Sequence, residues 1–378
     1  MTISALERLR SEVLAATTPE ARAETTLKLA VCLGQLGKID EARDLLSQVR
    51  ERFSSGQLPR VSIRLLLAEG VISYYDDLSD SSDRLNRALV LAKSMGLLDM
   101  CAEISVWISH LAYNFERYGA LANALREVFL GFEFLNDALK ARACLLAADG
   151  NCYLGRTEIA STWYASARIF SRKCHDHATM VAIEYNRLGM GLSRIRVERA
   201  LDFHASTATR RSWLLELESV RRLHTGFDVN ALSELMDLCD AYTHELLDEF
   251  AKALSSLRTI QKKGAAQRCG VSDALLEMEI AWCESKLTGV GASGLLHNSN
   301  LDRIEALGAN EGLLALSFIG DASEFTVGST ELERYSQIRS DAVAYYQRTI
   351  SELANALTVT LPYLDLVAGV AGLRSSGD

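Results

Sequence analysis

Apolar residues recur at intervals of three and four along most of this 378-residue chain, which is the spacing of one face of an α-helix. Within residues 4–16 the apolar stripe consists of Leu6, Leu9, Val13 and Leu14. Thr18 and Pro19 follow, and a capping threonine with proline at the first helical position is typical of a helix start. The pattern predicts one helix over residues 4–16 and another that begins at Pro19.

The chain after Pro19 has the pattern of two helices joined by a short turn. The first carries the apolar residues Leu27, Ala30, Val31 and Leu33, and the second carries Ala42, Leu45, Leu46 and Val49. Gly37 stands between them, and glycine adopts without steric cost the left-handed conformation that commonly ends a helix. We therefore expect a helix pair that ends before Ser54.

A small residue recurs through the first half of the chain on steps of 38 to 41 residues. The series is Ala42, Ser81, Ala122, Ala160 and Ala200. A small residue at a fixed phase indicates repeated close contact between helices in a stacked array. The phase predicts further helix pairs over residues 60–95, 100–135, 138–173 and 178–212, and it is lost beyond Gly226.

Two stretches resemble the turn and second-helix start of a tetratricopeptide repeat, namely Leu33-Gly34-Gln35-Leu36-Gly37-Lys38-Ile39-Asp40-Glu41-Ala42 and Tyr153-Leu154-Gly155-Arg156-Thr157-Glu158-Ile159-Ala160. The resemblance covers roughly residues 20–212 and implies an all-α fold, a right-handed α-solenoid of tetratricopeptide-like helix pairs. The step of about 40 residues, longer than the usual 34, is similar to that of the longer-helix arrays in bacterial signal-responsive regulators.

We expect the repeat array to occupy residues 1–225 and an irregular helical region to occupy residues 226–378. The glycine-rich stretch 288–294 contains the pattern G-x-G-x-x-G, but it follows a helix-like segment where a dinucleotide site needs a strand, which favours a linker. An amphipathic stretch from about Thr330 to Val359 predicts a long helix. Residues 330–372 are expected to cap the apolar end of the array.

Composition narrows the class of protein further. The chain has three prolines, and no run resembles a strand flanked by turns. The net charge of −9 argues against a general nucleic-acid binder, whose affinity comes from lysine and arginine on phosphates. Eight cysteines lie mostly inside apolar helical runs, which favours reduced thiols over disulfides. The sequence has no signal peptide or membrane-length apolar run, so we expect a cytoplasmic protein that binds no membrane.

The stretch Cys174-His175-Asp176-His177 is the densest group of reactive side chains. Such residues could bind zinc or activate a thiol, so a cysteine-dependent hydrolase is one interpretation. Adjacent helical residues point in different directions, and no second ligand pair stands at a suitable spacing. The favoured interpretation is a polar turn between helix pairs, with no metal and no cofactor.

Arginines concentrate in one region of this acidic chain. Five of them form a candidate patch for an acidic partner: Arg194, Arg196, Arg199, Arg210 and Arg211. Arginine forks match carboxylate and phosphate groups. Glu198, Asp202, Glu216 and Glu218 are interleaved with them, so pairing within the chain is the favoured alternative.

In tetratricopeptide proteins the first helices of successive repeats line a concave groove that binds a peptide or helix of a partner. Carried over residue by residue, that register gives the partner-binding candidates Lys28, Gln35, Tyr74, Asn114, Arg142, Asp149, Tyr153, Tyr185 and Asn186. The chain lacks the repeated asparagines of the family's chaperone-tail clamp. Trp107 and Trp163 are interpreted as core residues because aromatic side chains dominate buried helix contacts.

The first functional hypothesis is a non-catalytic interaction module that acts as an adaptor, inhibitor or sensor subunit, with self-association left open. The second is a regulator whose helical array responds to a small ligand or short peptide. The third is a hydrolase that uses Cys174 and His177.

Overall fold

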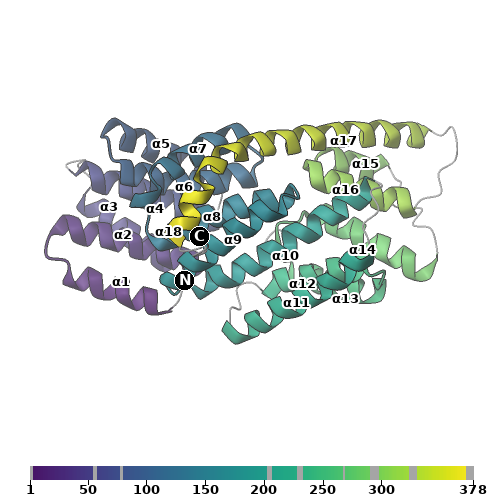
Figure 1. Cartoon of the computed structure of the whole chain (residues 1–378), viewed down its shortest axis with the longest axis horizontal. Coiled ribbons are helices and arrows are strands. Elements are labelled where there is room, and N and C mark those ends of the chain that lie inside the picture. Colours follow the sequence, from purple (N-terminus) through teal and green to yellow (C-terminus); the bar gives the residue numbers. More distant parts are fainter. Residues whose placement is uncertain are drawn as a thin grey trace, which may run out of the picture. The chain divides into compact units, whose positions relative to one another are not determined.

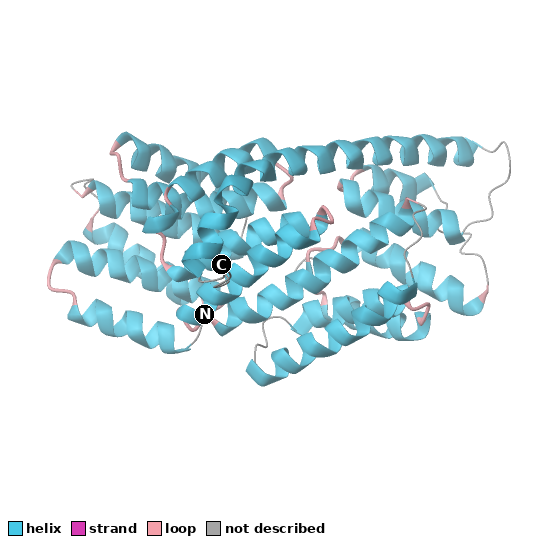
Figure 2. Ribbon diagram, in the orientation of Figure 1, coloured by secondary structure: helices cyan, strands magenta, loops and turns pink. Residues whose placement is uncertain are grey.

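The computed structural model describes residues 3–53, 58–76, 80–201, 207–227, 233–266, 269–289, 298–322 and 330–371. All regular secondary structure in these ranges is helical, and none of it is a strand (Figure 2). The all-α class that the residue spacing indicated is therefore confirmed. The helix over residues 4–16 is observed as α1 (Ile3–Ala15), and Thr18 caps the next helix by accepting a hydrogen bond from the backbone N of Ala21 at 3.1 Å.

The chain forms two units, which are described separately. Unit 1 comprises residues 1–150, 158–180 and 353–378, and unit 2 comprises residues 151–157 and 181–352. The boundary near residue 225 that the sequence pattern predicts stays a prediction. Two long helices, α10 (His177–Ala200) and α17 (Thr330–Leu357), begin in one unit and end in the other.

Unit 1 is built from helix pairs (Figure 1). Its helices after α1 are α2 (Pro19–Gln35), α3 (Ile39–Arg52), α4 (Pro59–Asp76), α5 (Ser81–Ser94), α6 (Leu98–Asn114), α7 (Tyr118–Leu130), the 3-10 helix η1 (Phe132–Phe134), α8 (Asp137–Tyr153), α9 (Thr157–Lys173), the 3-10 helix η4 (Thr358–Tyr363) and α18 (Leu364–Ala371). Helices α2 and α3, α4 and α5, and α6 and α7 pack against each other, and α2, α4 and α6 contact one another in succession. We call the first helices of the pairs, α2, α4, α6 and α8, the inner helices.

A three-residue turn with one backbone conformation joins many neighbouring helices. Its middle residue is left-handed and is Gly37, Gly96, Glu116, Gly155, His175 or Asp248. The next residue donates its backbone N–H five residues back, as from Lys38 to the carbonyl of Leu33 at 2.9 Å. This bond satisfies a carbonyl that the helix end leaves without a partner. The turn predicted at Gly37 is thus one of a set, which also includes three residues other than glycine.

The same turn fixes the register of the small residues. Ala42 and Ala160 lie five residues after Gly37 and Gly155, and both are buried. The residue five positions after Glu116 is Leu121, which is buried, whereas Ala122 is only half-buried. The sequence series therefore placed its third member one residue too late. The expected pair over residues 178–212 is also wrong, because α10 continues without a turn to Ala200. Ala253, five residues after Asp248 and fully buried, is the next true member.

Side-chain contacts repeat the step of about 39 residues in both units. In unit 1 the guanidinium of Arg64 on α4 donates to the carboxylate of Glu103 on α6, 39 residues on, and Asn114 Nδ2 donates to the hydroxyl of Tyr74, 40 residues back, at 2.9 Å. In unit 2 Trp282 Nε1 donates to Asp321 Oδ2, again 39 residues on, at 2.8 Å. The step of about 39 residues therefore also occurs beyond Gly226.

Unit 2 contains most of α10 and α17, together with α11 (Thr207–Phe227), α12 (Ser233–Leu246), α13 (Phe250–Lys263), α14 (Asp273–Thr288), α15 (Asn298–Glu305) and α16 (Ala309–Ala322). Helices α12 and α13 form a tight pair, and α14 packs against both α13 and α16. Gly289 ends α14 in a left-handed conformation, and residues 290–297, most of the expected linker, lie outside the described part.

The C-terminal segment of unit 1 packs against its helix pairs. The ring of Tyr363 in η4 stacks on Phe129 of α7 with centroids 5.3 Å apart. A Cβ added at Gly150 of α8 would lie 2.7 Å from Leu357 Cδ1, so this close packing needs glycine. Within the described residues, the stretch Leu332–Ala371 is long and apolar enough to cross a membrane by length and composition, with 28% of its most apolar window buried. The sequence pattern had suggested no such stretch.

Candidate functional site

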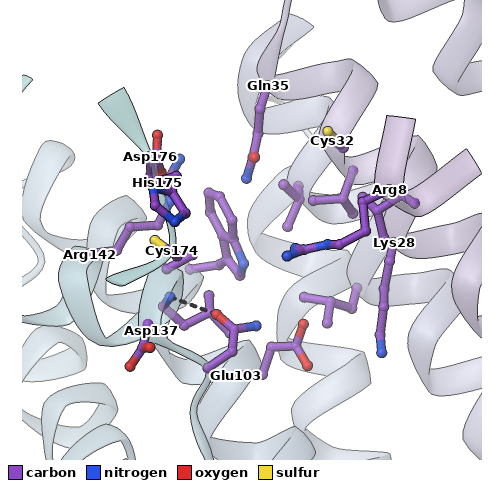
Figure 3. A pocket seen from close by; sticks show the side chains of 18 of the residues that line it. Arg8, Lys28, Cys32, Gln35, Glu103, Asp137, Arg142, Cys174, His175 and Asp176 are labelled. Carbon is purple, nitrogen blue, oxygen red and sulfur yellow. Dashed lines mark hydrogen bonds between the residues drawn. The ribbon is translucent and has the colours of Figure 1, made fainter. Parts of the chain in front are cut away.

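A cavity of about 450 Å³ lies in unit 1 on the side of the inner helices (Figure 3). All four inner helices contribute to its wall, and α1 and the turn between α9 and α10 add to it at the edges. Its lining includes Arg8, Leu9, Glu12, Lys28, Val31, Cys32, Gln35, Arg64, Leu67, Val71, Glu103, Trp107, Asp137, Leu139, Arg142, Lys173, Cys174, His175 and Asp176. Figure 3 shows Arg8, Lys28 and Cys32 on one side of the space and Arg142, Cys174 and His175 on the other.

Arg142 of α8 is the most distinctive polar group of this pocket. Its guanidinium carbon lies 4.8 Å from the centre of the Trp107 ring, in a cation–π arrangement. Burial alone would lower the pKa of Arg142, but the neighbouring Tyr75 and Asp176 outweigh it and the pKa is raised. Arg142 therefore carries its charge in the pocket at every pH at which the protein is folded.

The aromatic groups behind Arg142 form a rigid support. Trp107 meets the rings of Tyr74 and Tyr75 edge to face, each at 6.2 Å between centroids. Burial, reinforced by the positive charge of Arg142, lowers the pKa of His110 to about 3, so this imidazole is neutral. Stacked and edge-to-face rings of this kind restrict side-chain motion. Trp107, which these rings contact, is the aromatic group over which the Arg142 guanidinium lies in the described pocket wall.

Arg64 and Gln35 bring incompletely satisfied polar atoms to the wall. Arg64 is 5% exposed and donates through Nη1 to Glu103, whereas its Nε has no hydrogen-bond partner. The buried Oε1 of Gln35 also lacks a partner. Buried polar atoms are normally paired, so these two atoms favour a ligand or ordered water in the pocket.

The turn between α9 and α10 contains the Cys174–His177 group. Asp176 caps α10, since one of its carboxylate oxygens accepts a hydrogen bond from the backbone N of Thr179 at 3.1 Å. Cys174 is half-buried, and burial raises the pKa of its thiol, which disfavours the reactive thiolate. The side chain of His177 lies outside the described part. The polar turn expected from the sequence is therefore observed, and no group of three or more metal-ligating side chains occurs within the described ranges.

Three of the nine groove candidates meet in this pocket, namely Lys28, Gln35 and Arg142. Tyr74 and Asn114 bond to each other beside it, and Asp149 is buried in α8, where it accepts a hydrogen bond from the hydroxyl of Tyr164 at 2.9 Å. The remaining candidates, Tyr153, Tyr185 and Asn186, belong to unit 2. Tyr153 and Tyr185 are buried, and the hydroxyl of Tyr153 donates to Asn310 Oδ1.

The arginine patch does not form one surface. Arg196 is buried between Glu245 and Glu279 in the core of unit 2 and is inaccessible to a partner. Arg194 pairs with Glu198 at 2.7 Å, and Arg199 pairs with Asp248 at 3.5 Å. The side chains of Arg210 and Arg211 in α11 lie outside the described part. Of the three described arginines, only Arg194 pairs with one of the interleaved acidic residues, Glu198, whereas Arg196 and Arg199 pair with acidic residues farther along the chain.

Sequence reasoning missed several pocket residues, including Arg8, Arg64, Glu103 and Lys173. Arg64 and Glu103 carry opposite charges at a separation of 39 residues, which is the repeat step. A search for opposite charges at that step would have found this pair. Trp107, interpreted as a core residue, is 3% exposed and also forms part of the pocket wall.

No protein-family model matches the chain, and searches of curated proteins and of solved structures find no match to it.

Proposed function

We propose that this chain is a non-catalytic interaction module, a right-handed α-solenoid of tetratricopeptide-like pairs that binds a peptide or helix of a partner protein. The observation that carries the proposal is the unit 1 pocket, to which successive inner helices contribute side chains. Successive helices of a repeat array add contacts along an extended ligand, which gives affinity without a deep active site. The partner relationship would be that of an adaptor, inhibitor or sensor subunit.

The proposed setting is the cytoplasm of a bacterium. All eight cysteines are free and six of them are buried, as suits a reducing compartment. The bacterial origin rests on the resemblance of the 40-residue step to arrays in bacterial regulators.

A second candidate function is ligand-responsive regulation. The pocket volume of about 450 Å³ lies in the range of small-molecule sites, and α1 and the α9–α10 turn border the same space. A small ligand that contacts these segments would stabilise them. Slower hydrogen exchange in α1 on adding the ligand would support this function, and unchanged exchange at saturation would exclude it.

Affinity purification with pocket variants tests the interaction module directly. Full-length wild-type protein, the double variant Lys28→Ala with Arg142→Gln, and the control Arg126→Gln would each be used with extract of the native host. Arg126 is exposed on α7 and donates only within its helix, to Asn123 Oδ1 at 2.8 Å. We expect the wild type and the control to retain the same partner and the pocket variant to lose it, with unchanged circular dichroism. A partner held equally by all three proteins would contradict the proposal.

A further inference from the structure

The charges that line the unit 1 pocket are unevenly paired. Of the acidic groups, Glu103 pairs with Arg64, Glu12 pairs with Arg8 at 3.6 Å, and Asp176 caps α10. Three cations of the same wall, Lys28, Arg142 and Lys173, have no carboxylate within 4.0 Å among the described residues. Asp137 is the remaining acid, and it lies in the first turn of α8, where the helix dipole favours a carboxylate. The pocket thus holds unpaired positive charge although the chain as a whole is acidic.

Arg142 is the clearest example of a cation in this pocket without a carboxylate partner. Its guanidinium carbon lies 4.8 Å from the centre of the Trp107 ring, and a side-chain hydrogen bond with Tyr75 helps to raise its pKa. An arginine held in this way is prepared to donate two parallel hydrogen bonds to a carboxylate or phosphate. Asp176 is near enough to raise the pKa of Arg142 but is not within ion-pair distance. Arg142 is half-buried and has no carboxylate within 4.0 Å among the described residues, so an incoming anion would be stabilised here.

Apolar side chains also line the wall. Leu9, Val31, Leu67 and Val71 come from α1, α2 and α4. Apolar ligand surface placed against these side chains would leave water, which favours binding by about 25 cal/mol per Å². Cationic and apolar side chains therefore line the same pocket, and one occupant can contact both kinds.

We propose that the unit 1 pocket binds an anionic group attached to an apolar body, with Arg142 as the principal anion contact and Lys28 and Lys173 as supporting cations. This inference rests on the proposed function, which takes the pocket as the place where a ligand binds. It adds the chemical class of that ligand. The anion can be a carboxylate or phosphate of a small amphiphile, or an acidic side chain between apolar residues of a peptide. The two sources share the chemistry, and the experiment separates them.

A series of probes with one apolar chain and different head groups tests the charge preference. Octanoate, octyl phosphate, octanol and octylammonium would be titrated below their aggregation concentrations into the full-length protein. Binding would be followed by calorimetry and by tryptophan fluorescence, with Trp107→Phe to identify the responding indole. We expect at least one anionic probe to bind about tenfold more tightly than octanol, because hydrogen bonds to a charged group are stronger than those between neutral groups. Equal binding of octanol or octylammonium would overturn the proposal.

Variants then identify the residue responsible. Arg142→Gln should abolish the preference for the anionic probe, Arg142→Lys should retain part of it, and the control Arg126→Gln should leave it unchanged. Lys28→Gln changes an exposed side chain and should reduce the preference for the anionic probe several-fold. This variant replaces the Arg142 variants in the test if those do not fold. A preference that survives both Arg142→Gln and Lys28→Gln would refute the assignment.

A peptide arm distinguishes the source of the anion. Two capped hexapeptides, Leu-Glu-Leu-Leu-Glu-Leu and its glutamine counterpart, would compete with the bound anionic probe. If only the acidic peptide displaces the probe, the pocket is assigned to a peptide ligand. If neither peptide displaces the probe, the pocket is assigned to a small amphiphile. Both results are consistent with a pocket that prefers anions. Equal displacement by the two peptides would contradict it. Capture of a partner from extract is a separate measurement. If the protein still captures its partner but shows no preference for anionic probes, only this inference is refuted and the proposed function stands.

Discussion

Arg196 Nη2 donates a hydrogen bond to Glu279 Oε1 at 2.6 Å in the core of unit 2, where Glu279 is 0% exposed. On its other side Arg196 Nε lies 3.1 Å from Glu245 Oε2, and the guanidinium carbon lies 3.5 Å from the centre of the Tyr242 ring. One buried cation thus faces two buried carboxyl groups. Arg199 and the thiol of Cys283 are the other titratable groups that act on Glu245 or contact it.

This arrangement predicts a pH dependence of stability. Burial raises the pKa of Glu245 well above its usual value, and this effect exceeds the attraction of Arg196, while Glu279 adds to the rise. When the pKa of a carboxyl group is higher in the folded than in the unfolded protein, its contribution to stability is fully present below the pKa in the unfolded chain, which is about 4.3 for glutamate. That stability is lost as the pH rises through the folded pKa. We expect the free energy of unfolding of unit 2 to fall as the pH increases above about 4.3, measured by urea denaturation across a pH series.

The variant Glu245→Gln isolates this contribution. It keeps the shape of the protonated side chain and cannot ionise, so its unfolding free energy should fall less with pH than that of the wild type. Wild type and variant with parallel pH profiles would show that Glu245 is already ionised in the folded protein.

Removing the shared cation should be costly. Arg196→Met removes the cation that both buried carboxyl groups contact, and removing one partner of a buried ion pair destabilises a protein by about 3–5 kcal/mol. Arg199→Met is the matched control, because Arg199 lies on the same helix in an exposed pair with Asp248. An exposed pair contributes at most about 1 kcal/mol. Chemical denaturation of both variants measures the difference, and equal small losses would argue against a buried charge cluster.

The sequence predicted the local parts of this fold better than its long-range parts. The cap at Thr18 and the turn at Gly37 depend on a few neighbouring residues, so their patterns were sufficient. The turns at Glu116 and Asp248 have the same backbone without glycine, and they were missed because these residues carry no such signal. Ala200 fell on the 40-residue step by coincidence, since nothing local shows that α10 continues past the expected turn.

The same limit applies to the pocket. Lys28, Gln35 and Arg142 were found because the inner-helix register assigns them to one face. Arg8 and Lys173 come from α1 and from the end of α9, whose approach to the inner helices depends on tertiary packing. The ion pair between Arg196 and Glu279 joins residues 83 positions apart, and a buried cluster of this kind leaves no periodic pattern.

The left-handed turns predict that introducing glycine at Glu116 stabilises the protein and that replacing glycine at Gly37 destabilises it. Glu116 has φ 54°, a conformation that costs residues with a side chain about 1–2 kcal/mol. The greater freedom of glycine in the unfolded chain offsets part of that gain. We therefore expect Glu116→Gly to stabilise unit 1 by about 0.5–1 kcal/mol in thermal or urea unfolding. Gly37→Ala, at φ 75° with no heavy atom within 4 Å of an added Cβ, should destabilise it by a similar amount. Destabilisation by Glu116→Gly together with stabilisation by Gly37→Ala would show that these two residues are not left-handed in solution.

Gly150 tests how closely the C-terminal segment packs on unit 1. A methyl group at this position would lie 2.7 Å from Leu357 Cδ1, and overpacking of this kind costs about 1–3 kcal/mol. That cost exceeds the gain of up to about 1 kcal/mol from replacing glycine with alanine inside a helix. Gly150→Ala should therefore destabilise unit 1 and speed hydrogen exchange in residues 353–371.

Two further variants make this prediction specific. Leu357→Ala creates the space that the added methyl needs, so the double variant with Gly150→Ala should be more stable than the sum of the single changes predicts. Gly189→Ala in α10, where an added Cβ meets nothing within 4 Å, should be neutral or stabilising. Additive losses in the double variant, with exchange in residues 353–371 unchanged, would show that Leu357 does not pack against Gly150 in solution.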